Sequence, residues 1–251
     1  MSATASPSDP YHAALSSITL NDFVGQWIDN FHQRRLDSLN SLKLDQLLRR
    51  KNIYLFKAKN LEVVTDLVRS LLDAHLSSQE ETLFGKVLEA IALFVCARTH
   101  NGRKSAAQGI DIEFQFNSNY YIVSVKSGPN WGNHQQVQRM KQNFSAAKRI
   151  LNLPNAIAVN GCCYGRDNQE NKGDYLKLCG QSFWELISND PNFYLSFIEP
   201  LGQNAKEKNE EFFRGYYRIV NRFTEEFFRK GWCRDGRIDW EGLVKFNSGK
   251  T

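Results

Sequence analysis

Two short segments of alternating residue type, 110–116 and 121–126, constrain the fold of this chain more than any other feature. Every second residue from Ile110 to Phe116 is isoleucine or phenylalanine, and the residues between them are polar. In the second segment tyrosine and valine occupy the odd positions. This alternation is typical of strands with one apolar face, and residues 117–119 are turn formers. The sequence therefore predicts an antiparallel hairpin.

The register of this hairpin decides which side chains meet at its open end. Antiparallel pairing brings Asp111 level with residues 124–126, so that a carboxylate and the Lys126 ammonium group can meet. A three-residue loop would pair Asp111 with Val125 and leave Lys126 on the opposite face. A loop of two or four residues, or a bulge, is therefore required.

Helical periodicity surrounds the hairpin on both sides. Apolar residues recur at three- and four-residue spacings in 20–76, 78–97, 135–151, 183–187 and 205–230. Ser78 and Glu81 form a capping-box pattern, which predicts a separate helix start there. The apolar run 156–164 predicts an interior strand, and 193–200 predicts a short strand ended by proline. Helices before and after a hairpin-centred sheet indicate an α/β or α+β fold.

The length of 251 residues fits one domain with a sizeable core. We expect residues 1–17 to be disordered, 18–76 to form an N-terminal helical extension, 77–200 to form the catalytic core and 201–251 to form a C-terminal helix and tail. No composition shift or linker separates these parts into independent domains.

Composition narrows the class of protein. Lys and Arg exceed Asp and Glu by 32 − 27 = 5, a mild excess that suits a polyanionic partner. Five cysteines without CxxC spacing argue against a disulfide framework or a structural zinc site. The N-terminus lacks a secretory signal, and no apolar run approaches the roughly 20 residues that span a bilayer. The chain is therefore expected to be soluble and cytoplasmic, and no membrane partner is expected.

A carboxylate beside a lysine is the pair that metal-assisted phosphodiester cleavage needs. The carboxylate binds a divalent cation, and the lysine steadies an attacking water or the developing negative charge. The alternative for Asp111 and Lys126 is a salt bridge on a half-exposed hairpin. The turn-rich loop Gly128–Asn133, which follows Lys126 directly, favours a functional site.

These residues resemble a known group of enzymes. An acid on the first strand, an SVK tripeptide on the second and an acid on the preceding helix resemble the PD-(D/E)XK nuclease superfamily. The run YIVSVKSGPNWGN, with YLFKAKN and GKVLE upstream, resembles type II restriction endonucleases over roughly residues 50 to 185. The resemblance implies a restriction-endonuclease-like core, with a central mixed sheet flanked by helices.

The resemblance also implies an activity. It points to a homodimeric, sequence-specific, Mg²⁺-dependent endonuclease that cuts double-stranded DNA and leaves 5′ phosphates. A DNA methyltransferase that protects the same site would accompany it. Asp111 matches the metal-binding aspartate, and Lys126 matches the catalytic lysine. The acid expected two residues before the lysine is replaced by Ser124, whose hydroxyl can hydrogen-bond a water at the metal but carries no charge.

The missing carboxylate must come from elsewhere. No Asp or Glu occurs between Lys126 and Asp167, so the search turns upstream. Glu89 matches the helical glutamate of the family, and Glu113 on the first strand is the competing ligand. The resemblance makes the main-chain carbonyl of Val125 a further ligand.

DNA contacts are expected beyond this group. Amide side chains can read adenine edges in the major groove, and those predicted here, together with one tryptophan, are Asn130, Trp131, Asn133, Gln135, Gln136 and Gln138. The predicted phosphate contacts are Lys104 and Lys141, with Arg103, Lys148 and Arg149. For each residue, ordinary surface polarity is the alternative.

Three other functions remain open from the sequence. A structure-specific repair nuclease or junction resolvase would use the same chemistry. Because Ser124 replaces an expected acid, the chain could also be a DNA-binding module that has lost catalysis. A protein whose basic helices bind acidic partners is the third.

Overall fold

The computed structural model describes residues 18–203 and 205–250. The predicted disorder of residues 1–17 lies outside these described residues. The described chain forms two compact units. Unit 1 contains residues 18–28 and 85–203, and unit 2 contains residues 29–84 and 205–250. That the chain acts as a single nuclease domain stays a prediction.

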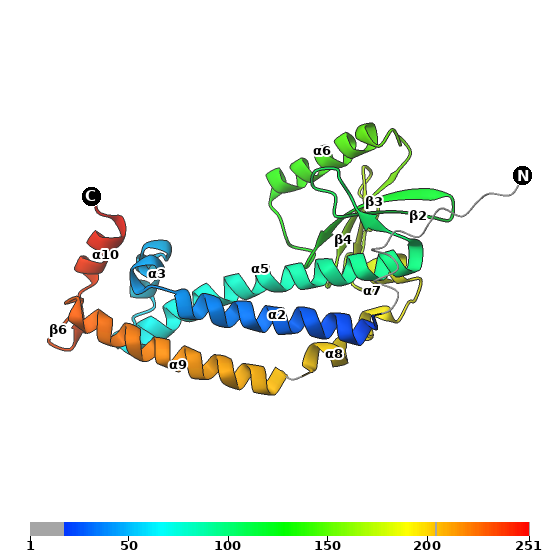
Figure 1. The fold of residues 1–251 in the computed structure, drawn as a ribbon. Coiled ribbons are helices and arrows are strands. Elements are labelled where there is room, and N and C mark those ends of the chain that lie inside the picture. Colours follow the sequence, from blue (N-terminus) through cyan, green and yellow to red (C-terminus); the bar gives the residue numbers. More distant parts are fainter. Residues whose placement is uncertain (1–17, 204, 251) are drawn as a thin grey trace, which may run out of the picture. The chain divides into compact units, whose positions relative to one another are not determined.

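The structure contains the following elements (Figure 1). The helices are α2 (Leu20–Ser41), α3 (Leu44–Arg50), α4 (Ile53–Ala58), α5 (Val64–His100), α6 (His134–Ile150), α7 (Gln181–Ser188), the 3₁₀ helix η1 (Phe193–Leu195), α8 (Ile198–Gly202), α9 (Ala205–Arg229) and α10 (Trp240–Ser248). The strands are β1 (Arg103–Lys104), β2 (Ile112–Phe116), β3 (Asn119–Lys126), β4 (Ile157–Cys162), β5 (Leu176–Cys179), β6 (Cys233–Arg234) and β7 (Arg237–Ile238). Among the described residues, no helix has the length and apolar content needed to cross a membrane.

Unit 1 is built on a five-stranded mixed sheet in the order β1-β2-β3-β4-β5. The pairs β1–β2 and β2–β3 are antiparallel, and β3–β4 and β4–β5 are parallel. Parallel neighbours need a crossover, which α6 supplies between β3 and β4. A mixed sheet flanked by helices confirms the predicted α/β fold with a restriction-endonuclease-like core.

The β2–β3 hairpin meets the predicted register condition. Phe116 pairs with Asn119 and Ile112 pairs with Val123, so the loop contains only two residues, Asn117 and Ser118. Their φ angles are 49° and 64°, and positive φ at both central residues is what a tight hairpin turn of this hand requires. The even-length loop keeps the two apolar faces in step.

Helices cover both faces of the sheet. The helix α6 lies along one face, where Met140, Phe144 and Ala147 pack with Ile122 and Ala158 of β3 and β4 (Figure 1). On the other face His100, at the end of α5, stacks on Phe114 with a centroid distance of 5.1 Å. There α7 also approaches β4 so closely that a Cβ atom on Gly161 would lie 2.2 Å from the Phe183 ring.

Unit 2 has its own apolar core. Leucines of α3 and α5 pack with aromatic residues of α9, and the fully buried members include Leu44, Leu47, Leu67, Leu71, Phe223 and Phe227. A charged pair joins two of its helices, because Arg35 Nε lies 2.7 Å from Glu80 Oε1. The prediction of one long helix over 205–230 is confirmed by α9.

Two local predictions are wrong. The helix does not begin at Ser78, because α5 runs without a break over 37 residues, and Ser78 accepts a hydrogen bond from Thr82 inside it. No proline interrupts the helix, and buried leucines continue on both sides of Ser78. Residues 193–200 form η1 and part of α8 in place of a strand, because Phe193 and Phe197 lie four residues apart and both pack on Trp184.

Candidate active site

Asp111 lies directly before β2, at the open end of the hairpin. Its backbone N–H donates to the Val123 carbonyl at 2.8 Å, and its Oδ2 accepts the Val125 N–H at 2.7 Å. One more step of the strand register places it opposite Ser124, two residues from Lys126. The other carboxylate oxygen, Oδ1, accepts no hydrogen bond from the described residues. Asp111 is therefore held rigidly through one oxygen only.

The pKa of Asp111 responds to the charges of the other predicted site residues. Burial raises the pKa of the Asp111 carboxyl, and the hydrogen bond from Val125 and the positive charges of Lys126 and Lys104 oppose that rise. The negative charge of Glu89 raises the same pKa. Glu89 of α5, Lys104 of β1 and Lys126 of β3 are therefore all close enough to Asp111 for their charges to act on it.

Glu89 projects from α5 and is half-exposed. Its only ion pair among the described residues is with Lys104, at 3.7 Å between Lys104 Nζ and Glu89 Oε1. Both side chains are well exposed, at 68% for Lys104 and 39% for Glu89, so this pair is weak. The Glu89 carboxylate is therefore accessible to a further ligand. Leu88, Ile91, Ala92 and Val95 of the same helix are buried, which confirms the apolar spacing predicted for 78–97.

Glu113, the competing acid, is in a different situation. Its side chain is 4% exposed, and its Oε1 accepts a hydrogen bond from Arg103 Nε at 2.7 Å. Its Oε2 accepts one from the Ser105 hydroxyl at 2.9 Å. Both carboxylate oxygens are thus used to fasten β1 and the following loop to β2. The alternation of residue types predicts that Glu113 lies on the polar face of the strand. It does not show that the neighbouring strand β1 covers this side chain.

Lys126 ends β3 and is half-buried. Its Nζ donates to the Val125 carbonyl at 3.0 Å and lies 5.1 Å from the centre of the Trp131 ring. Gly128, at the start of the loop that carries Trp131, lies close to Tyr164, since a Cβ atom there would lie 2.4 Å from that ring. A lysine held over an aromatic ring keeps its charge at a defined place.

The loop ends in a well-formed helix start. The Asn133 side chain accepts the Gln136 N–H at 3.0 Å, and the Gln136 side chain accepts the Asn133 N–H at 2.9 Å. These two predicted DNA contacts therefore form a capping box for α6. Asn130, Gln135 and Gln138 are exposed.

Ser124 is 2% exposed, and its neighbour in the sheet is a residue that sequence reasoning missed. Asn160 of β4 pairs with Ser124, is also 2% exposed and accepts the Cys162 thiol at 3.8 Å. On β5 the next residue in the row is Lys177. The sequence did offer a signal for Asn160, since it is a polar residue inside the otherwise apolar run 156–164.

The donors near Asp111 suit a hard cation. The described residues contain no cluster of three or more His, Cys, Asp and Glu side chains that could hold a metal. Two carboxylates, from Asp111 and Glu89, and the Val125 carbonyl are all oxygen donors, which Mg²⁺ and Ca²⁺ prefer over nitrogen or sulfur. Because one of these three ligands is a main-chain carbonyl, the set fits such a cation without a third acidic side chain.

The raised pKa of Asp111 has a consequence for stability. Since the folded-state pKa lies above the ordinary value of 3.8, ionised Asp111 costs folding free energy above the folded-state pKa, and the cost vanishes as the pH falls below 3.8. We expect Asp111→Asn to raise the melting temperature at pH 7 in EDTA, with the gain shrinking towards pH 4. Thermal denaturation measures this, and Asp235→Asn in an exposed turn is the charge-matched control. A lower melting temperature of Asp111→Asn at pH 7 would contradict the expectation.

Comparison with known proteins identifies a family. The family model described as type II restriction endonuclease EcoO109I matches residues 18–209, well over half of the 251 residues. The match includes Glu89, Asp111 and Lys126, and it covers residues of both compact units. Among curated proteins, no match was found.

Proposed function

This chain belongs to the type II restriction endonuclease EcoO109I family, whose members are site-specific deoxyribonucleases, and from that premise we propose a sequence-specific, Mg²⁺-dependent activity on double-stranded DNA that leaves 5′ phosphates. One observation carries the proposal. Asp111 accepts the Val125 N–H, Lys126 donates to the Val125 carbonyl, and the charge of Glu89 acts on Asp111.

Asp111, Glu89 and the Val125 carbonyl are the proposed ligands of Mg²⁺. When bound, the cation supplies positive charge to the scissile phosphate and favours ionisation of water. The hydrogen bond from the Val125 N–H orients the Asp111 carboxylate before any ligand arrives. Glu113 is not proposed as a ligand, because both its oxygens are engaged with Arg103 and Ser105.

Lys126 is the proposed catalytic residue for charge stabilisation. Its ammonium group rests on the Val125 carbonyl, so it stands beside a proposed ligand atom. From that place it can orient the attacking water and stabilise negative charge that develops during in-line displacement. Its contact with Trp131 limits its freedom, which reduces the reorganisation needed in the reaction.

Ser124 occupies the position where a third acid would lie. A buried hydroxyl leaves the proposed ligand set with two negative charges rather than three. Ser124 is proposed to hydrogen-bond a water of the site rather than to bind the cation. It is also the one observation that favours the second candidate function, a DNA-binding protein without catalysis.

Homodimerisation is part of the proposal, since symmetric cutting of a palindrome needs a two-fold protein. Three exposed aromatic side chains support it. Phe213, Tyr217 and Phe228 are 43%, 54% and 52% exposed, and their spacing places them on one side of α9. The proposed contacts to DNA bases are Asn130, Trp131, Gln135 and Gln138, with Lys104 and Lys141 on phosphates. A methyltransferase with the same target is the proposed partner in the cell.

Incubation of plasmid DNA with the protein and Mg²⁺ tests this function. We expect discrete, reproducible fragments with 5′-phosphorylated ends, and no cleavage when EDTA replaces Mg²⁺. End-labelling before and after phosphatase treatment identifies the 5′ phosphate, and sequencing of the ends identifies the target. Several plasmids of unrelated sequence are needed, so that the target site is present. Intact plasmids throughout, together with salt-dependent DNA binding, would favour the non-catalytic function.

A further inference from the structure

A basic groove follows the outer side of α6. It is bounded by this helix and by the turn at Gly173 and Asp174 before β5, and the side chains that α6 contributes to it are mainly Gln138, Lys141, Gln142, Ser145, Lys148 and Arg149. Three of these carry positive charge, and the others are short or amide side chains that can donate hydrogen bonds.

The groove has the length of a DNA backbone contact. Gln138 and Arg149 are eleven residues apart, which corresponds to about 16 Å along a helix. A DNA strand carries one phosphate for about every 3.4 Å of helix axis, so the stripe can accompany several phosphates. It begins one turn after the start of α6, and α6 follows the loop that leaves Lys126. The groove therefore leads away from the candidate active site.

One acid interrupts this basic stripe. Asp174 Oδ2 lies 2.9 Å from Lys141 Nζ, and Asp174 is well exposed, at 71% of its side chain. Lys141 also lies 5.9 Å from the centre of the Tyr175 ring, and Tyr175 is buried against Phe144. In this arrangement Asp174 occupies the place at Lys141 that an anion such as a phosphate would take.

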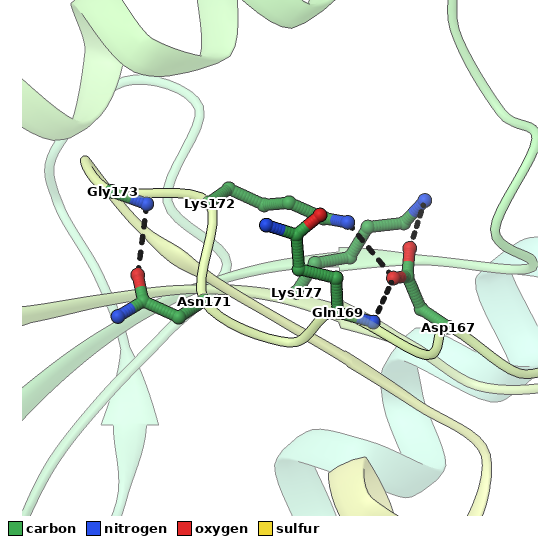
Figure 2. A network of polar contacts seen from close by, with 6 residues as sticks. All are labelled: Asp167, Gln169, Asn171, Lys172, Gly173 and Lys177. Carbon is green, nitrogen blue, oxygen red and sulfur yellow. Dashed lines mark hydrogen bonds and ion pairs between the residues drawn. The ribbon is translucent and has the colours of Figure 1, made fainter.

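The hairpin that presents Asp174 is braced from within (Figure 2). Lys172 and Lys177 both point at Asp167, with Nζ–Oδ distances of 2.8 and 3.0 Å. The Gly173 N–H donates to the Asn171 side chain at 2.8 Å. Hydrogen bonds from Lys172, the Gln169 N–H and Lys177 hold the pKa of Asp167 below its ordinary value, so this carboxylate stays charged at neutral pH.

Backbone contacts complete the brace. The Lys172 N–H donates to the Tyr175 carbonyl at 3.0 Å, which closes a tight turn with Gly173 and Asp174 at its centre. Gly173 has a φ of +84°, a conformation that side chains rarely adopt. The turn is therefore fixed in shape, and Asp174 is held facing α6.

We propose that the groove along α6 binds the phosphates of DNA and that Asp174 is a built-in competitor for those phosphates at Lys141. A phosphate that reaches Lys141 must displace Asp174 or tolerate its negative charge. Sequence-independent binding pays this cost as well, and it has no base contacts that add to its affinity. Asp174 thus limits sequence-independent attachment. The inference rests on the proposed function and names a residue that tunes it.

Equilibrium binding to a non-cognate duplex tests the inference without catalysis. Fluorescence anisotropy in EDTA, over a series of salt concentrations, would compare wild type with Asp174→Asn, Lys141→Ala and the double variant. We expect Asp174→Asn to tighten binding about two- to five-fold at low salt, in keeping with an exposed ion pair. Lys141→Ala should weaken binding and lower the salt slope by about 0.9, the value for one lost phosphate contact.

Glu210→Gln on α9 is the matched control, since it removes one exposed negative charge from the other compact unit. In the wild-type background, Asp174→Asn should tighten DNA binding more than Glu210→Gln does. In the Lys141→Ala background, the two substitutions should tighten binding equally. An equal effect of the two variants in wild type would overturn the competitor role of Asp174. An unchanged salt slope in Lys141→Ala would overturn the proposal that the groove binds DNA phosphates. If plasmid cleavage still occurs, either result leaves the proposed function intact.

Discussion

Lys126→Ala is expected to lower the rate of DNA cleavage by about 100- to 1000-fold, the usual loss when one preorganised charge-stabilising group is removed. Its ammonium group stands beside the Val125 carbonyl and over Trp131. Lys104, the other lysine whose charge acts on Asp111, is 68% exposed and pairs with Glu89. Single-turnover cleavage of the plasmid measures the rate. DNA affinity should change only a few-fold, because Lys126 is one positive charge among many.

Lys126 also lowers the pKa of Asp111, so the variant needs a second readout. If the loss came only from protonation of Asp111, raising the pH from 7 to 8.5 would restore the rate. We expect no such recovery. Lys245→Ala, which removes an exposed lysine from α10, is the control and should cleave like wild type. Cleavage by Lys126→Ala within ten-fold of wild type would contradict the proposed role.

Glu89→Gln and Glu113→Gln are expected to separate function from stability. Glu89 is half-exposed and weakly paired, so Glu89→Gln should leave the melting temperature nearly unchanged. Loss of one of two carboxylate ligands should reduce cleavage at limiting Mg²⁺ by at least the about 10- to 100-fold that loss of a hydrogen-bonding partner of a metal ligand costs. Higher Mg²⁺ should recover part of the rate. A titration of the cleavage rate against Mg²⁺ measures both effects.

Glu113→Gln is expected to behave in the opposite way. The buried Glu113 carboxylate accepts charge-assisted hydrogen bonds that hold β1 on β2, and their loss costs about 1 to 3 kcal/mol. For a chain of this size each kcal/mol lowers the melting temperature by about 2 to 4 °C. Cleavage at a temperature well below melting should stay within a few-fold of wild type. A severe loss of cleavage in Glu113→Gln with normal stability would instead make Glu113 the ligand.

The hairpin was the most predictable part of the fold. Alternation is a local property, and it reports directly which face of a strand each residue occupies. The parity argument then limited the loop length, and the two-residue turn at Asn117 and Ser118 satisfies it. The helix boundary at Ser78 failed for the same local reason, since a capping pattern inside a long helix looks identical to one at its start.

The accessibility of the two candidate acids was not predictable. The resemblance favoured Glu89 and kept Glu113 as the competitor, but nothing in the sequence showed which of the two carboxylates has its oxygens occupied. Arg103 and Ser105 reach Glu113 because β1 pairs with β2, a contact that no periodicity announces. The partner of Ser124 depends in the same way on the parallel pairing of β3 with β4, which joins segments more than thirty residues apart.

By itself the sequence determined the hairpin, the placement of Asp111 and Lys126 at its open end and the resemblance to a nuclease, because each of these depends on residues close together in the chain. The tertiary structure decided which carboxylate is accessible, that Asn160 lies beside Ser124 and that Asp174 lies on Lys141. These depend on packing between distant segments. Periodicity shows which face a side chain occupies, but burial and long-range contacts decide whether that side chain is available to a ligand.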